Sequence, residues 1–271
     1  MNQIPMHQEN QDGHLTLINN NLKKCPKCDD YQEFLREEIR INDLILSPPR
    51  VMKQLCYCQK QQLEKQEKEK KQAKQKSLLM DRYKAAEIPP RFLNWDFSTI
   101  DDTENKKECQ KYVDCFDMNL LTGNGLFMIG TKGRGKTTLA ICILKELINN
   151  GYTAMIISFT EILNRITATY TPGSLIKQSQ IIDDLLKFDF LILDDIGRES
   201  YTDKRMELAF EIVDKLNKNK KCIAITANPE MIEKLKDPAR FKFSDEFKAI
   251  LDRLDEMCKT VLTFNGTSFR S

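Results

Sequence analysis

Short apolar runs alternate with longer amphipathic stretches over the C-terminal part of the chain. The apolar runs are typical of buried strands and lie at residues 125–129, 154–158, 188–195, 222–226 and 260–264. Between them, apolar side chains recur every three or four residues, which is the spacing of a helix. This spacing predicts helices at residues 138–149, 159–169, 175–187, 202–218 and 243–258. Strands that alternate with helices form a parallel sheet with both faces covered, so we expect an α/β fold.

The N-terminal part follows a different pattern. Residues 1–21 are rich in Asn and Gln and predict a poorly ordered leader or a short helix. Residues 30–42 are interpreted as a helix that ends before the break Ser47-Pro48-Pro49. Residues 59–76 consist almost wholly of Lys, Glu and Gln, which favours a solvated helix. A nucleic-acid-binding arm is the alternative for that segment, and its interspersed glutamates weaken it.

These changes of pattern predict the domain organisation. We expect a small N-terminal domain at residues 1–58, a charged helical linker at 59–77 and a larger α/β domain at 78–271. Residues 77–100 form the bridge into the large domain, and their aromatic side chains would pack either against an adenine ring or in the core. An amphipathic helix is expected at 101–119.

Composition and charge exclude some classes of protein. The chain has 271 residues and a formal net charge of only +2, so its overall charge does not require a nucleic-acid partner. It has no apolar run of the length that spans a membrane, and its polar N-terminus lacks the apolar core of a signal peptide. We therefore expect a cytoplasmic protein without membrane contact.

One glycine-rich segment has the spacing G-x-x-x-x-G-K-T of a phosphate-binding loop. It lies between a predicted strand and a predicted helix, so bound phosphates would meet a helix N-terminus. Its glycines let backbone N–H groups turn toward phosphate oxygens, and Lys136 adds a positive charge for the β- and γ-phosphates. A glycine-rich turn without a ligand would leave this lysine unexplained. The residues predicted to bind ATP are Gly130, Thr131, Lys132, Gly133, Arg134, Gly135, Lys136, Thr137 and Thr138.

Polar residues at two later strand ends predict the rest of the site. Asp194 and Asp195 end the strand at 188–195. We expect Asp194 and the Thr137 hydroxyl to hold Mg²⁺, and Asp195 to orient or deprotonate the attacking water. Asn228 would position the same water, although Asn-Pro is also a common turn opening. A turn or helix-cap role is the alternative for the aspartates, and phosphate chemistry downstream of the loop disfavours it.

Two cysteine pairs predict a structural zinc site in the N-terminal domain. Cys25 and Cys28 have the C-x-x-C spacing, and Cys56 and Cys58 form a tighter C-x-C pair. A domain this small lacks a core, so a metal is a reasonable source of stability. The alternative is a redox C-x-x-C, but no thioredoxin-like βαβ pattern surrounds it.

The remaining metal-ligating residue types are interpreted without a metal. His7 and His14 are expected to be solvated tail residues. The other cysteines are interpreted as small buried hydrophobic residues, and they are Cys109, Cys115, Cys142, Cys222 and Cys258.

Several segments together resemble the AAA+ ATPases of the DnaC/DnaI helicase-loader group. They are residues 130–137, 191–197, 225–228, 250–254 and the ending Ser268-Phe269-Arg270. The transposition helper ATPases of the IstB type share much of this pattern. The resemblance covers about residues 78–271. The N-terminal cysteines resemble the zinc domain of DnaI-type and phage loaders more loosely, because the C-x-C pair and the lack of a histidine differ from the commoner spacing.

The resemblance implies an ATP-dependent replicative helicase loader. Such proteins bind the hexameric DNA helicase through the N-terminal domain and help to deliver it onto single-stranded DNA. The AAA+ domain would bind ATP, self-associate side by side and contact DNA. An IstB-type transposition helper, which binds duplex DNA and a transposase, is the alternative. A small-molecule P-loop kinase is a third, but the sequence shows no convincing lid insertion.

The resemblance also implies roles for two arginines. Arg253 matches the arginine finger that reaches the γ-phosphate of a neighbouring subunit. Its alternative is a surface arginine paired with Asp252 or Asp255. Arg270 would be a second phosphate sensor. Asp195 stands where many AAA+ proteins have Glu, which predicts slow turnover.

Candidate single-stranded DNA ligands combine basic and aromatic side chains. They are Arg165, Tyr170, Lys177, Arg198, Tyr201, Lys204 and Arg205. Solvated helix faces explain each of them equally well.

Overall fold

The computed structural model describes residues 23–265 except residues 31, 37–38, 42–43, 49, 172, 174 and 176. The chain divides into two compact units, Met1–Ser77 and Leu78–Ser271. The interpretations of His7, His14 and Arg270 lie outside the described residues. Within the described part, no helix is both long enough and apolar enough to cross a membrane.

The described part of the N-terminal unit contains two antiparallel strand pairs. Strand β1 (Glu33–Arg36) pairs with β4 (Arg50–Lys53), and β2 (Ile39–Ile41) pairs with β3 (Leu44–Ser47). The predicted helix at residues 30–42 is therefore wrong. Its Glu, Leu and Arg residues favour a helix locally, but Phe34 lies opposite Met52 in a pairing between distant residues. Tertiary pairing outweighs the local preference here.

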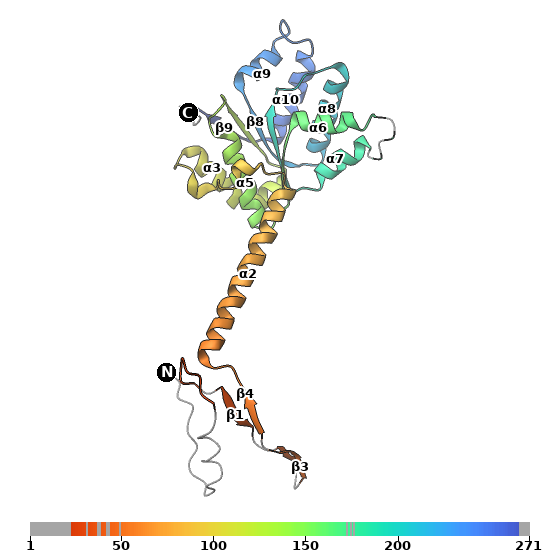
Figure 1. Ribbon diagram of the computed structural model, residues 1–271. Coiled ribbons are helices and arrows are strands. Elements are labelled where there is room, and N and C mark those ends of the chain that lie inside the picture. The colour runs from red at the N-terminus through yellow and green to blue at the C-terminus, as the bar shows by residue number, and fades with distance from the viewer. Residues whose placement is uncertain are drawn as a thin grey trace. The chain divides into compact units, whose positions relative to one another are not determined.

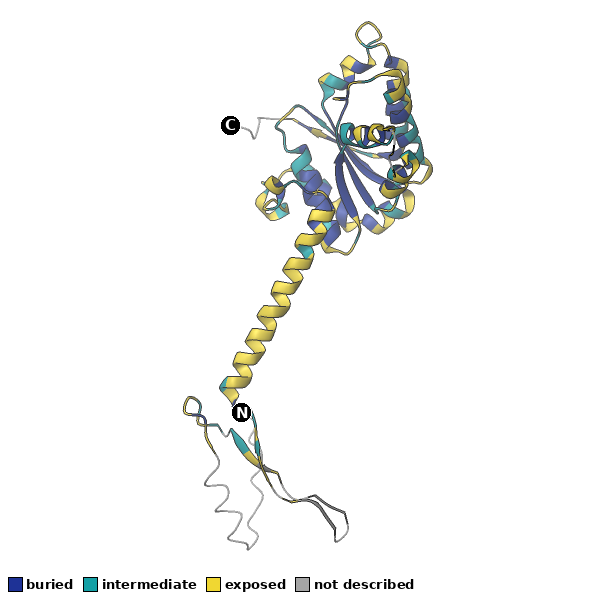
Figure 2. Ribbon diagram, turned by 45° about the vertical axis from the view of Figure 1, so that its right-hand side comes forward, coloured by how far each residue is buried: buried dark blue, intermediate teal, exposed yellow. Residues whose placement is uncertain are grey.

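Helix α2 (Tyr57–Ala85) begins at the second cysteine pair and extends beyond the charged segment on both sides. Figure 2 shows it exposed along most of its length. Lys, Glu and Gln on all sides leave it without an apolar stripe, so the helix depends on the local helix propensity of these residues. Near its C-terminal end, Tyr83 is buried in the core of the second unit.

The second unit is built on a five-stranded parallel sheet with the order β6-β7-β8-β5-β9 (Figure 1). The strands are β5 (Leu126–Gly130), β6 (Ala154–Ser158), β7 (Phe190–Ile196), β8 (Cys222–Ala227) and β9 (Thr260–Phe264). They confirm the predicted α/β fold.

Helices cover both faces of this sheet. One core contains α6 (Phe159–Ala168), α7 (Gln178–Leu186), α8 (Asp203–Lys218), α9 (Pro229–Lys236) and α10 (Ser244–Met257). The other contains α3 (Glu104–Asp114), α4 (Phe116–Thr122) and α5 (Lys136–Asn149). Side chains of β7 alternate between the two: Leu191 and Leu193 enter the first core, and Phe190 and Ile192 enter the second.

Three local predictions need correction. Of the five cysteines predicted to be buried, Cys115 is exposed, because it lies between two helices, whereas the other four are buried. The predicted helix at 101–119 is two helices, because the backbone leaves the helical conformation at Cys115 and the next residue, Phe116, is buried against Phe190. Helix α9 was not predicted. Of the bridge aromatics, Tyr83 and Phe92 pack in the core, which supports the packing interpretation over the adenine one.

Candidate functional site

The glycine-rich loop joins β5 to α5, which begins at Lys136. Gly133 and Gly135 have φ of 79° and 83°, a left-handed conformation that side chains disfavour. Gly130 has no room for a side chain, since a Cβ there would lie 2.6 Å from the carbonyl oxygen of Phe264. The loop therefore exposes backbone N–H groups at a helix N-terminus, as an anion-binding site requires.

Lys136 is held inside the loop. Its side chain is buried, and its Nζ donates to the carbonyl oxygens of Gly130 at 2.7 Å and Thr131 at 2.9 Å. Beside it, Arg134 Nε donates to Thr131 Oγ1 at 3.0 Å. The ammonium group is thus positioned at the mouth of the loop, where the β- and γ-phosphates of a nucleotide would lie.

Asp194 lies directly against the loop. Its Oδ1 accepts hydrogen bonds from Thr137 Oγ1 at 2.8 Å and from Thr226 Oγ1 at 2.7 Å. Burial raises the pKa of Asp194, while the two hydroxyl hydrogen bonds act in the opposite direction. A hydroxyl and a carboxylate oxygen this close are a donor set that suits Mg²⁺. The structure thus brings together the two predicted magnesium ligands.

Thr226 was not predicted as a site residue. Its hydroxyl donates to Asp194 and accepts from the backbone N–H of Asp195 at 2.8 Å, so it contacts both acids. It is fully buried on β8, where an apolar residue would be expected. The polar residue in the apolar run Ile223-Ala224-Ile225-Thr226 was the available signal.

The side chains of Asp195 and Asp194 have different partners. The φ of Asp195 is 59°, and the pairing of β7 with β8 shifts register between Leu193 and Ile196. Such an irregularity re-aims a side chain at a strand end. The Asp195 carboxylate forms an ion pair with Arg198.

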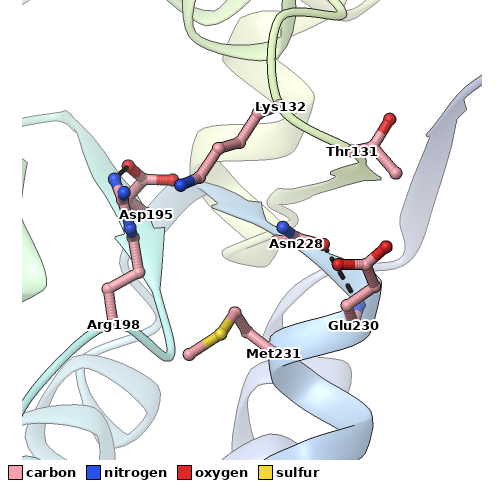
Figure 3. A pocket seen from close by; sticks show the side chains of 7 residues that line it. All are labelled: Thr131, Lys132, Asp195, Arg198, Asn228, Glu230 and Met231. Carbon is pink, nitrogen blue, oxygen red and sulfur yellow. Dashed lines mark hydrogen bonds and ion pairs between the residues drawn. The ribbon is translucent and has the colours of Figure 1, made fainter.

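Asp195 and Arg198 line a cavity of about 410 Å³ at the carboxyl ends of the strands (Figure 3). Lys132 points toward Asp195 from the opposite side in that view. Asn228 also lines this cavity, and its Oδ1 accepts from the backbone N–H of Glu230 at 3.1 Å, which caps α9. The structure therefore supports both readings of Asn228, a cap and a cavity residue. Asp195, Asn228 and the loop meet at one edge of the sheet.

Arg253 is not among the residues that line this cavity. On α10, its guanidinium lies 3.6 Å from Asp214 of α8 and 3.6 Å from Glu256, with the Phe210 ring 5.9 Å away. Its partners differ from the Asp252 or Asp255 of the surface-pair alternative. A finger role would require a neighbouring copy of the chain, so it stays a prediction.

The four N-terminal cysteines form a cluster. Their Sγ atoms all lie within 4.8 Å of one another, with Cys25 to Cys58 at 3.6 Å and Cys56 to Cys58 at 3.3 Å. Four sulfurs about 2.3 Å from a tetrahedral zinc ion would lie about 3.8 Å apart, so the cluster has the size of a zinc site.

The thiols of the cluster differ in how readily they lose a proton. Backbone N–H groups of Lys27 and Cys28 lower the pKa of Cys25 to about 6, which favours the thiolate that zinc requires. Hydrogen bonds with Cys56 and Cys25 raise the pKa of Cys58 to about 12. Metal binding would therefore displace protons from the cluster.

Most predicted DNA ligands have partners within the chain. Arg165 pairs with Glu87 at 2.8 Å and with Glu161 at 3.0 Å. Lys204 lies 3.6 Å from the centre of the Tyr170 ring. These contacts neither exclude nor define a DNA surface.

The sequence of this chain is similar to a known protein family and to proteins of Escherichia coli. The sequence pattern of the family described as IstB-like ATP binding protein matches residues 53–271. The chain belongs to this family. The replicative helicase loader DnaC of Escherichia coli K12 is 26% identical over 164 residues, which are 60% of this chain and 62% of DnaC. The chain therefore spans less than two thirds of the curated relative. The uncharacterized protein YdaV of the same strain is 26% identical over 110 residues, 40% of this chain and 44% of YdaV.

Two solved structures share the fold of this IstB-like protein. The DnaC helicase loader has a TM-score of 0.54 at 23% identity, over 65% of this chain and 100% of that one. DnaI has a TM-score of 0.52 at 19% identity, over 68% of this chain and 94% of that one. These likenesses confirm the predicted α/β fold, and the similarity to DnaC over 164 residues confirms the resemblance to the DnaC/DnaI group.

Proposed function

We propose that this IstB-like ATP-binding protein is an ATP-dependent loader of a replicative DNA helicase. It would bind the hexameric helicase through its N-terminal unit and help place it on single-stranded DNA in the cytoplasm. The similarity to DnaC over 164 residues supports this proposal. So does the four-cysteine cluster in a unit of its own, because a separate binding module suits a protein that connects a partner to an ATPase.

The contact set of Thr137, Asp194 and Thr226 carries the ATPase part of the proposal. Mg²⁺ held by Thr137 and, through water, by Asp194 would neutralise charge on the phosphates. Lys136 and the loop N–H groups bind the β- and γ-phosphates. Asp195 takes a proton from water as the water oxygen bonds to the γ-phosphorus. The bond to the β–γ bridging oxygen then breaks, giving ADP and phosphate.

Capture of the helicase by the full chain tests the loader role. We expect the tagged protein to retain the replicative helicase of its host in the presence of ATP. The double variant Cys25→Ser/Cys56→Ser should lose this capture yet still bind ATP, because the cluster and the nucleotide site lie in different units. Failure to capture the helicase with ATP, with ADP and without nucleotide would contradict the proposal.

The family description favours one further candidate, an IstB-type transposition helper. Such a protein would bind duplex DNA and a transposase. Competition between single-stranded and duplex DNA of the same length and sequence separates the two functions. A strong preference for duplex DNA, together with no helicase capture, would replace the loader by the helper.

A further inference from the structure

The chain folds back on itself between Asp195, near the end of β7, and Arg198. Asp195 and Gly197 both have left-handed φ angles, 59° and 97°. Two such residues within three positions reverse the chain, so the side chain of Arg198 returns beside that of Asp195. The two form an ion pair at the rim of the cavity that the loop, Asn228 and Met231 also line (Figure 3).

The backbone of this segment is anchored to the core. Glu199 is only 7% exposed, and its Oε2 accepts from the Gly197 N–H at 2.9 Å and from the Tyr201 hydroxyl at 2.7 Å. The Tyr201 ring in turn packs edge-on against Phe241 and Phe247. The backbone of this segment is thus held in place by Glu199, whereas the Arg198 side chain is partly exposed at the cavity.

The Arg198–Asp195 pair can exchange partners. The two side chains are 45% and 37% exposed, and water screens ion pairs of this kind, so they hold weakly. A guanidinium binds phosphate through two parallel hydrogen bonds, which are stronger than a screened pair with one carboxylate. Lys132 faces the same carboxylate, so Asp195 would keep a cationic neighbour if Arg198 turned away.

We propose that Arg198 binds the γ-phosphate of ATP within its own subunit and so distinguishes ATP from ADP. With ATP bound, Arg198 leaves Asp195 for the γ-phosphate, and the freed carboxylate faces the attacking water. With ADP bound, Arg198 returns to Asp195 and occupies it. The inference rests on the nucleotide site proposed above and adds to it a residue that distinguishes ATP from ADP.

Nucleotide affinities of Arg198→Met in the full chain test this role. The probes are a non-hydrolysable ATP analogue and ADP, each with Mg²⁺, measured by calorimetry. Loss of a charge-assisted contact should weaken the analogue about tenfold or more. The affinity for ADP should stay within about twofold of the wild-type value, because ADP lacks the γ-phosphate that Arg198 would bind. Arg198→Lys should recover part of the lost affinity.

Arg240→Met is the matched control. Arg240 also pairs with an aspartate three residues earlier, Asp237 at 3.1 Å, but it does not line the cavity. It should change neither affinity. Thermal unfolding without nucleotide checks the fold of each variant. If Arg198→Met is destabilised, Arg198→Gln, which can still hydrogen-bond to Asp195, replaces it in the same measurements.

The outcomes separate the inference from the proposed function. Equal weakening of both nucleotides, or no change in either, overturns the role of Arg198 while leaving the site intact. A wild-type protein that binds neither nucleotide overturns the site itself. Selective loss of the analogue in Arg198→Met, with Arg240→Met unchanged, supports the inference.

Discussion

The two units of this protein are stabilised in different ways. In the C-terminal unit, apolar side chains from strands and helices form continuous cores on both faces of the sheet. In the described part of the N-terminal unit, the buried side chains are Cys25 and Cys56, whereas Phe34 and Val51 are 41% and 50% exposed. Because the described side chains of this unit form no apolar core, they need another source of stability, and the cysteine cluster supplies the ligands for one. Hydrophobic burial supports the nucleotide site, whereas the proposed partner-binding unit has a cysteine cluster that would stabilise it by binding zinc.

Metal removal should produce the largest difference in stability between the two units. Structural zinc contributes on the order of 10–16 kcal/mol in small zinc-folded domains. A strong chelator under reducing conditions, or Cys25→Ser, should therefore unfold the N-terminal unit and leave ATP binding unchanged. Limited proteolysis, with zinc analysis of the purified protein, measures this.

Cys115→Ser is the control for this experiment, since Cys115 is exposed and lies outside the cluster. It should change neither zinc content nor protease resistance. Absence of stoichiometric zinc in the wild-type protein would contradict the metal role.

A substitution in the apolar core should instead destabilise the C-terminal unit and leave the N-terminal unit unchanged. Phe247 is fully buried beside Tyr201 and Phe241, so Phe247→Ala should destabilise the C-terminal unit by about 3–5 kcal/mol. Zinc content should not change. Denaturant unfolding with and without nucleotide measures the free energy of unfolding of the C-terminal unit, because only that unit should be stabilised by the nucleotide. Phe34→Ala, the same change at an exposed position of the N-terminal unit, should cost much less.

Lys136→Ala should abolish ATP binding, because a charge-assisted phosphate contact is lost. The variant should still fold, at some cost in stability, because the buried Lys136 also donates to the carbonyl oxygens of Gly130 and Thr131. Lys145→Ala is its counterpart. Lys145 is equally buried on α5 and donates to the carbonyl oxygens of Leu93 and Trp95, away from the loop. It should lower stability and spare nucleotide affinity. Equal loss of affinity in the two variants would remove the special role of Lys136.

Arg253→Ala should leave ATP binding intact and lower only the hydrolysis that rises with protein concentration. Because its ion pairs are partly exposed, the change in stability should stay below about 1 kcal/mol. Lys218→Ala, which removes another partner of Asp214, is the control. ATPase rates at increasing protein concentration decide the matter, and identical rates would reject the finger.

The smallest expected effect concerns pH. Burial raises the pKa of Glu199 above its ordinary value of 4.5, with Tyr201 opposing the shift. Between pH 4.5 and the raised pKa, the unfolded state binds fewer protons than the folded state, so this group makes stability fall as pH rises. In Glu199→Gln this contribution is absent. As pH rises through this window, the free energy of unfolding of the variant should therefore increase relative to that of the wild type. A difference between the two proteins that does not change with pH would contradict the assignment.

Several features followed from the sequence because they depend on local patterns. Apolar runs and helical spacing predicted the sheet strands, and the G-x-x-x-x-G-K-T spacing predicted the loop around Lys136. The C-x-x-C and C-x-C spacings predicted a four-cysteine cluster, since each pair is local and four thiols suit one ion.

Other features depended on contacts between distant residues. The strand pair of Phe34 with Met52 replaced a locally favoured helix. Thr226 joined the site because its hydroxyl reaches Asp194 across the β7–β8 pair, a contact between side chains 32 residues apart that sequence spacing does not reveal. The turn that returns Arg198 to Asp195 depends on the buried Glu199 below it. Sequence patterns therefore determined which elements form and where phosphate binds, whereas tertiary packing decided which polar side chains face that phosphate, because packing alone sets strand order and loop direction.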